Sequence, residues 1–257
     1  MKTRTIKCHF KNSHHHLIDA RLDLPADRDA EDVKSYIIFC HCFTCTKETI
    51  TTFRLSRLLA ENGYGVLRFD FTGLGNSEGT FSETTFDTTR DDLASAISFL
   101  SENWQAPTYL MGHSLGGTTS LSIAQDHKCI KGVVTIASPS EPDHVLHHFG
   151  HALTLLEQGI TASFEVAGQF FEIEPGFVEQ VRSVDMKACL SKLDKPVLII
   201  NIENDALVDE SNAEEIQQWV KGEVTRVDVH GSDHLLTNKA AVEAVAGDII
   251  EWMNSIK

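Results

Sequence analysis

One pentapeptide, Gly-His-Ser-Leu-Gly at residues 112–116, constrains the fold of this chain more than any other feature. Residues 107–111 are typical of a short buried strand, and residues 117–124 are typical of the start of a helix. A serine between a strand and a helix lies on a tight, strained turn that exposes its hydroxyl beyond the sheet. Side chains at the two flanking glycines would collide with the neighbouring strand and helix. The pattern predicts Ser114 as a nucleophile, and an ordinary glycine-rich turn is the alternative.

Apolar β-rich runs alternate with helical patterns through most of the chain. This alternation predicts an α/β fold with a mainly parallel, doubly wound sheet. The expected strands are residues 17–24 (an exposed one), 36–41, 65–69, 107–111, 131–137, 196–202 and 223–229. The expected helices are residues 50–62, 86–103, 117–124, 213–220 and 240–256. We therefore expect a single domain over residues 1–257.

The alternation breaks between residues 138 and 194. A connection this long between two strands usually covers an active site, so we expect residues 138–194 to be a cap or lid insertion. A strand-like piece near 163–173 lies between two helical stretches. Four histidines recur at helical spacing and would share one helix face: His144, His147, His148 and His151. They indicate either a metal cluster or, more simply, a polar cap face near the mouth of a pocket.

The composition excludes several classes of protein. A net charge of −15 argues against a nucleic-acid partner and against an anionic membrane surface. The longest apolar runs are far too short to span a bilayer, so we expect no membrane span. The first residues lack the apolar core of a signal peptide, which predicts a cytoplasmic protein.

The chain has six cysteines, at positions 8, 40, 42, 45, 129 and 189. In a cytoplasmic protein we expect all of them to be reduced. Cys42 and Cys45 form a C-x-x-C motif after an expected strand and before an expected helix, so a redox role is an alternative interpretation. A zinc site would need a second ligand pair, and none with clear spacing is present. We therefore expect no metal.

A serine hydroxyl needs a base within hydrogen-bond reach, and the base needs an orienting acid. Candidates for both follow Ser114 in the chain. Asp205 comes shortly after the expected strand 196–202, at the carboxyl end where α/β folds place their sites. Asp209 is the alternative acid, although it fits better as the cap of the next helix.

The base candidate is His234, which lies on the loop between the last strand and the last helix. His230, at the end of that strand, is the alternative. The base must reach over the edge of the sheet to Ser114, and this favours the loop position. His113 lies beside the serine, where we expect it to pack beneath the turn.

An acyl-transfer site also needs donors for the oxyanion that develops on the substrate. The backbone N–H of Leu115, at the start of a helix, is the first candidate. The second donor should come from the loop after the strand that ends at His41. By position, the N–H of Phe43 is the best choice.

These residues resemble the α/β-hydrolase superfamily over nearly the whole chain, and residues 112–117 (GHSLGG) are most similar to its serine aminopeptidase and esterase branch. Residues 41–45 (HCFTC), 67–79 (LRFDFTGLGNSEG) and 233–236 (DHLL) resemble the hydrolase domain that some bacteria fuse to an OsmC-type peroxidase domain. Two positions depart from the superfamily pattern. Cys42 follows His41 where glycine is common, and Thr72 replaces the arginine of the D-x-R-G-x-G motif.

The resemblance implies the α/β-hydrolase fold and a hydrolytic Ser-His-Asp triad of Ser114, His234 and Asp205, with no cofactor. It implies the substrate less directly, because this fold hosts many reactions. We expect a carboxylesterase that cleaves small to medium acyl esters through an acyl-enzyme. The alternatives are a peptidase or thioesterase on the same triad, or a redox or interaction protein that uses Cys42 and Cys45.

Overall fold

The computed structural model describes residues 2–256; residues 1 and 257, the two ends of the expected domain, lie outside the described part. Eight strands form one sheet in the order β1-β2-β4-β3-β5-β6-β9-β10. Their bounds are β1 Thr3–Lys11, β2 Leu17–Pro25, β3 Tyr36–Cys40, β4 Gly65–Phe69, β5 Tyr109–His113, β6 Gly132–Ile136, β9 Val197–Ile202 and β10 Val224–Val229. Strands β1 and β2 are antiparallel to their neighbours, and the other six are parallel. The expected α/β class and mainly parallel sheet are confirmed.

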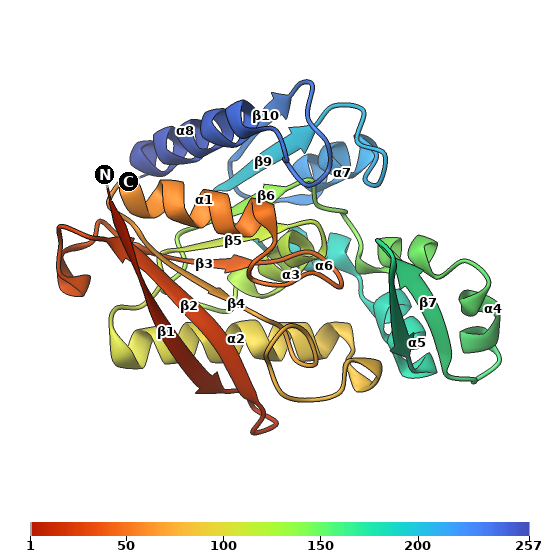
Figure 1. Ribbon diagram of the computed structural model, residues 1–257. Coiled ribbons are helices and arrows are strands. Elements are labelled where there is room, and N and C mark those ends of the chain that lie inside the picture. Colours follow the sequence, from red (N-terminus) through yellow and green to blue (C-terminus); the bar gives the residue numbers. More distant parts are fainter. Residues whose placement is uncertain (1, 257) are drawn as a thin grey trace.

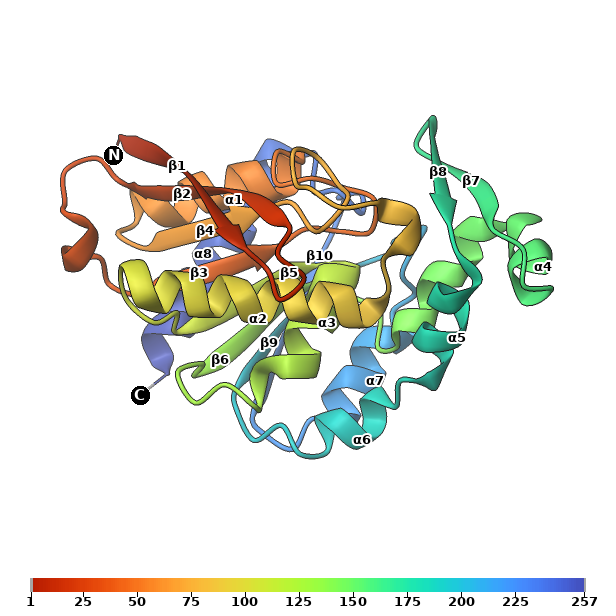
Figure 2. The same ribbon diagram turned by 90° about the horizontal axis from the view of Figure 1, so that it is seen from below.

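Helices cover both faces of the sheet, as Figures 1 and 2 show. Those packed on the sheet or beside it are α1 Ile50–Glu61, α2 Phe86–Asn103, α3 Leu115–Ala124, α7 Ser211–Trp219 and α8 Lys239–Ser255. Helices α1 and α8 share one hydrophobic core, and α2, α3 and α7 contribute to the core on the opposite face. The sheet is therefore doubly wound. Within residues 2–256, no helix combines the length and the apolar character needed to cross a membrane.

Strand β3 shows why the central strands are apolar throughout. Successive side chains of a strand point to opposite faces of the sheet. Ile37 and Phe39 belong to the core shared with α1 and α8, whereas Ile38 and Cys40 belong to the core shared with α2 and α3. Because helices cover both faces, every residue of β3 is buried.

The N-terminal edge of the sheet differs from the sequence expectation. Strand β1 was not expected, because lysines, threonines and a histidine interrupt its apolar pattern. Only Cys8 and Phe10 are buried in it, since β1 is the edge strand and one of its faces meets solvent. Strand β2, which was expected to be exposed, is almost entirely buried between β1 and β4. The pairing of β1 along the full length of β2 explains the difference.

Residues 138–194, called here the 138–194 segment, connect β6 to β9 and lie mainly beyond the carboxyl ends of the parallel strands (Figures 1 and 2). The segment contains a 3₁₀-helix Pro142–Phe149, α4 Ala152–Glu157, β7 Ala162–Val166, β8 Gln169–Ile173, α5 Pro175–Ser183 and α6 Met186–Leu190. The strand-like piece is thus a hairpin, and it turns at Ala167 and Gly168 with positive φ at both. The segment has a small core of its own, which also contains Leu115.

Candidate active site

Ser114 lies on a strained turn between β5 and α3. Its φ of 53° and ψ of −128° are unusual for a residue with a side chain and cost about 1–3 kcal/mol. Its N–H donates to the Ile136 carbonyl at 2.8 Å, which helps to hold the turn. A Cβ at Gly112 would overlap the Gly116 carbonyl, and a Cβ at Gly116 would overlap the Cys40 carbonyl. The expected strain and the expected need for both glycines are confirmed.

Asp205 and His234 come together from two loops at the carboxyl end of the sheet. His234 Nδ1 lies 2.7 Å from Asp205 Oδ2. The other carboxylate oxygen accepts from the N–H groups of Leu207 at 2.8 Å and Val208 at 3.3 Å. Burial raises the pKa of Asp205, but the hydrogen bonds from His234 and the backbone outweigh it and hold that pKa below its usual value. Asp205 is therefore ionised at neutral pH and can hold a proton on Nδ1 of the imidazole.

The two alternative residues occupy other positions. Asp209 lies one residue before Glu210, the N-cap of α7, and accepts a hydrogen bond from the Ser211 N–H at 3.0 Å. His230 is largely exposed and pairs with Glu203. Neither Asp209 nor His230 lines the cleft that contains Ser114.

Ser114 and His234 line the same cleft, which has a volume of about 360 Å³. The other residues that line it are Cys42, Phe43, Thr44, Cys45, Thr46, Thr49, His148, Val166, Ala167, Gln169, Leu207 and Leu235. Because Asp205 engages Nδ1, the Nε2 atom of His234 remains available for a serine proton. No hydrogen bond joins the Ser114 hydroxyl to this imidazole within residues 2–256. Such hydrogen bonds often tighten only when substrate is bound.

The two candidate oxyanion donors come from two separate segments of the chain. Leu115 is the first residue of α3, where a backbone N–H has no partner inside the helix. The Phe43 N–H lies on the loop after β3. Neither N–H donates a hydrogen bond to any other residue of the described part of the chain. Both are therefore free to donate to a ligand.

The loop that carries Phe43 is cross-linked. A disulfide joins Cys42 and Cys45, whose Cα atoms are 5.2 Å apart, within the usual range for a disulfide. The expectation that all six cysteines are reduced is therefore wrong for this pair. The tight turn explains the pairing, because Thr44 has a φ of 58° and the Cys45 N–H donates to the Cys42 carbonyl at 3.1 Å. Cys8, Cys40, Cys129 and Cys189 are free.

His41 holds the start of this loop, a role that the sequence analysis missed. Its Nδ1 lies 2.8 Å from the Cys42 carbonyl, and its Nε2 accepts from the Phe71 N–H at 3.2 Å. Burial lowers the pKa of His41 to about 4, so the ring is neutral and its Nδ1 carries the proton. The histidine before the oxyanion loop was the available signal, but only the fold shows what its ring contacts.

His113 packs beneath the serine turn, as expected. Its Nε2 lies 2.8 Å from the His234 carbonyl, and the two rings are 4.8 Å apart between centroids. Burial, together with the neighbouring His234, lowers the pKa of His113 to about 3. The neutral His113 ring donates a hydrogen bond to the His234 carbonyl and so helps to fix the backbone of the candidate base.

This buried ring predicts a loss of stability in acid. Unfolding returns the pKa of His113 from about 3 to about 6.5, so the unfolded chain binds the extra proton below pH 6.5. The stabilisation that comes from keeping the buried His113 ring neutral is present above pH 6.5 and is lost as the pH falls toward 3. Between pH 7 and pH 5 we expect His113 to lower the free energy of unfolding by about 2 kcal/mol. In urea unfolding, the free energy of unfolding of His113→Gln should fall by about 2 kcal/mol less between pH 7 and pH 5 than that of the wild type. If the two proteins showed the same dependence on pH, His113 would not be the buried neutral group.

The histidines of the 138–194 segment do not form the expected α-helical face. Residues 142–149 wind as a 3₁₀-helix, which brings the rings of His144 and His147 to 4.7 Å and those of His147 and His148 to 3.9 Å. His151 lies beyond it, at the start of α4. His148 lines the cleft, and His144 Nε2 lies 2.8 Å from the Leu207 carbonyl on the Asp205 loop. Within residues 2–256, no three His, Cys, Asp or Glu side chains are placed to hold a metal ion.

Comparisons with known proteins agree with this architecture. Residues 31–169 match the family described as serine aminopeptidase, S33. The esterase domain of a Rhodothermus marinus protein is 33% identical, with a TM-score of 0.77 and 98% of each chain covered. Est1E from Butyrivibrio proteoclasticus, bound to ferulic acid, has a TM-score of 0.80 at 21% identity, covering 97% of this chain and 98% of the other, and this shows a shared fold.

A curated relative is the mitochondrial palmitoyl-protein thioesterase ABHD10 of Mus musculus, which is 31% identical over 105 residues. That match covers 39% of this chain and 34% of the mouse protein, so it spans about a third of the relative's length. The family match covers more than half of the chain, and the esterase domain aligns with nearly all of it. This protein therefore belongs to the serine aminopeptidase S33 family and has the α/β-hydrolase fold.

Proposed function

We propose that this protein is a serine carboxylesterase that acts on small-molecule esters, with Ser114, His234 and Asp205 as its catalytic triad. The observation that carries the proposal is the hydrogen bond between Asp205 and His234 at the edge of the cleft that contains Ser114. The strained turn presents the serine hydroxyl to this cleft. The lowered pKa of Asp205 keeps the acid charged, so it can stabilise a protonated imidazole.

The reaction proceeds in two halves. Ser114 Oγ attacks the ester carbonyl while His234 Nε2 takes the serine proton, and the oxyanion accepts hydrogen bonds from the Phe43 and Leu115 N–H groups. The bond to the leaving alcohol breaks, and the alcohol takes the proton from His234. A water molecule then attacks the acyl-enzyme by the same route. The acid leaves, and Ser114 regains its proton.

Three further expectations belong to the proposal. The 138–194 segment acts as a cap, because its His148, Val166 and Ala167 line the cleft above Ser114. The closer likeness to hydrolase domains fused to OsmC-type peroxidase domains rests on residues 41–45, 67–79, 138–139, 142–147 and 233–236. A cytoplasmic location stays a prediction from the sequence.

A thioesterase is the second candidate function. The partial matches to palmitoyl-protein thioesterases favour it, and the same triad would cleave a thioester, whose thiolate is a good leaving group. An amidase or peptidase has less support, because amide cleavage must protonate a poor leaving group.

A matched set of acetyl compounds tests the proposal. We expect the purified protein to hydrolyse p-nitrophenyl acetate with the highest kcat/KM, an acetyl thioester next, and p-nitroacetanilide at least about 10³-fold more slowly. A serine-directed fluorophosphonate should modify Ser114 and stop turnover of all three. Turnover that survives complete modification of Ser114 would contradict the triad. Turnover that Cys45→Ser abolishes while Ser114→Ala spares it would favour the redox alternative.

A further inference from the structure

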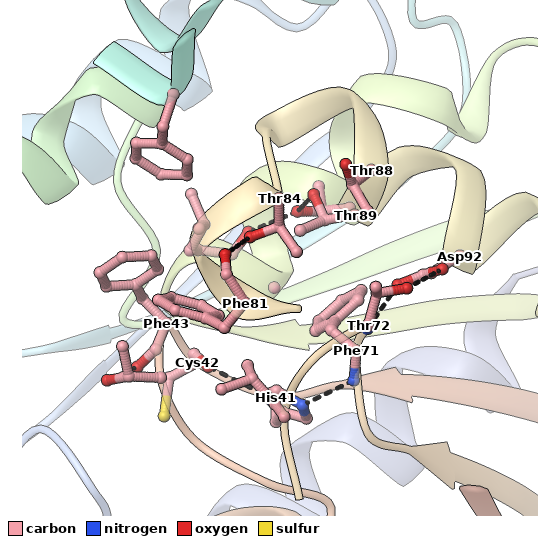
Figure 3. Close-up of a pocket in the computed structure, with 16 residues that line it drawn as sticks. His41, Cys42, Phe43, Phe71, Thr72, Phe81, Thr84, Thr88, Thr89 and Asp92 are labelled. Atoms are coloured by element: carbon pink, nitrogen blue, oxygen red, sulfur yellow. Dashed lines mark hydrogen bonds between the residues drawn. The ribbon is translucent and has the colours of Figure 1, made fainter. Parts of the chain in front are cut away.

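A second, smaller cavity lies behind the candidate oxyanion loop. Its volume is about 20 Å³, and its walls include the rings of Phe43, Phe81 and Phe177, the Leu115 side chain and several threonines. Figure 3 shows Phe43 and Phe81 beside one another at this cavity, with Thr84 and Thr89 close to the first turns of α2. The cavity and the larger cleft share the loop residues 42–44 but no others. The two spaces therefore meet at the loop that carries Phe43, and Leu115 lines only the small cavity.

The small cavity is apolar although threonines and an aspartate contribute to its wall. The threonine hydroxyls are used inside the protein: Thr72 donates to Asp92 at 2.9 Å, Thr84 to the Phe81 carbonyl at 2.7 Å, Thr89 to the Phe86 carbonyl at 2.8 Å and Thr119 to the Leu115 carbonyl at 2.9 Å. The Asp92 carboxylate is likewise occupied, by Asn12 and the Thr72 N–H. With their polar atoms engaged, these residues present methyl and methylene groups to the cavity.

The chemistry of ester cleavage assigns the two spaces to the two halves of a substrate. The leaving alcohol takes its proton from His234, so it must lie in the larger cleft, where His234 is found. The carbonyl oxygen points toward the N–H groups of Phe43 and Leu115. With the alcohol in the larger cleft, the small cavity lined by Phe43 and Leu115 is the other space beside the candidate oxyanion donors, and the acyl chain is assigned to it.

We propose that the small cavity is the acyl pocket and that it restricts the enzyme to esters of acetic and propionic acid with larger leaving groups. This inference rests on the proposed function. A cavity needs about 10–15 Å³ of space for the centre of a water-sized sphere to hold one water molecule. This cavity has about 20 Å³ in the same measure, which suits a methyl or, at most, an ethyl group. The cleft of about 360 Å³ places no comparable limit on the alcohol.

Aromatic packing keeps the pocket short. The ring centroid of Phe43 is 5.8 Å from that of Phe81 and 5.7 Å from that of Phe177, and Phe177 belongs to the core of the 138–194 segment. Lengthening the acyl chain would require these rings to move apart. Packed protein interiors resist such displacement, because extra methylenes force side chains out of their preferred rotamers.

A series of p-nitrophenyl esters with acyl chains of two, three, four and eight carbons tests the pocket. We expect kcat/KM to fall about tenfold or more between propionate and butyrate and further for octanoate. Phe177→Ala and the milder Phe81→Leu should each raise the butyrate-to-acetate ratio of kcat/KM at least about tenfold. Because Phe177→Ala could loosen the segment, Phe81→Leu keeps the test independent of that risk.

Phe170→Ala is the matched control, because Phe170 is 77% exposed and lines neither space. It should leave the chain-length profile unchanged. Ser114-dependent hydrolysis with octanoate preferred over acetate, or a profile that neither pocket variant alters, would overturn the acyl-pocket assignment alone. Hydrolysis that does not depend on Ser114 would instead overturn the proposed function.

Discussion

Replacing Ser114 with alanine is expected to lower kcat for p-nitrophenyl acetate by about 10⁴- to 10⁶-fold. The variant loses the nucleophile, so no acyl-enzyme forms and His234 has no serine proton to accept. The residual rate should come from substrate binding and the Phe43 and Leu115 N–H groups. Initial rates under saturating substrate, compared with the uncatalysed reaction, measure the loss.

Ser98→Ala is the matched control for this prediction. Ser98 is exposed on α2 and donates only to the Ala94 carbonyl, one helical turn earlier. Its loss should leave kcat unchanged and alter the free energy of unfolding by no more than about 0.5 kcal/mol. If Ser114→Ala retained a tenth or more of the wild-type kcat while remaining folded, covalent catalysis by this serine would be ruled out.

Replacing Lys47 with alanine is expected to destabilise the fold by about 3–5 kcal/mol. The Lys47 side chain is 1% exposed, and its ammonium lies 2.5 Å from Asp70 Oδ2 and 2.6 Å from Asp19 Oδ2. Burial raises the pKa of Asp19, but Lys47 and Arg21 outweigh it and lower that pKa. Removing the ammonium would leave a buried carboxylate at Asp70 without its charge partner.

Urea unfolding at neutral pH measures this loss of stability. Lys47→Met combined with Asp70→Asn should recover a large part of it, because the uncompensated charge at position 70 is removed together with its partner. Lys239→Ala is the matched control, since Lys239 is 81% exposed and its contact with Glu243 is 3.6 Å long. A loss below about 1 kcal/mol in Lys47→Ala would show that the buried ion pairs of Lys47 with Asp19 and Asp70 contribute little to the stability of the fold.

Residues 70–75 (DFTGLG) carry threonine where the family motif has arginine. The ion pair between Lys47 and Asp70 helps to explain why their loop still forms. Besides Lys47, the Asp70 carboxylate accepts from the N–H of Asn76 at 2.9 Å, so it ties the turn after β4 together. Thr72, which stands where arginine is common, binds Asp92 through both its N–H and its hydroxyl. Residues 70–75 thus stabilise the loops around them, and Phe71, Thr72 and Leu74 line the proposed acyl pocket.

Elements with a strong local pattern were predictable. Residues 65–69 and 86–103 were expected as a strand and a helix, and the structure has β4 and α2 at the same bounds. Helix α2 also has a capping box, formed by Thr85 and Thr88, which fixes its first turn. The acid and base were proposed for another reason: Asp205 and His234 each follow the end of an expected strand, and in the structure their side chains lie 2.7 Å apart.

Most of the features that sequence reasoning missed depend on contacts between distant segments, and one depends on the geometry of a tight turn. Strand β1 forms because it pairs with β2, and its own pattern is too polar to indicate a strand. The Cys42–Cys45 disulfide depends on the local turn, and the link from His144 to the Leu207 carbonyl depends on how the 138–194 segment packs against the Asp205 loop. Spacing along the chain does not determine any of these distances.

The class of fold and the strained serine turn could be predicted from the residues alone, and so could the candidates for catalysis, Ser114, Asp205 and His234. Periodicity, glycine positions and chain order are local properties, so they can be read without coordinates. The size of the space beside the candidate oxyanion donors could not be predicted in this way. That space lies between rings from residues 43, 81 and 177, and its volume depends on how separate segments pack together.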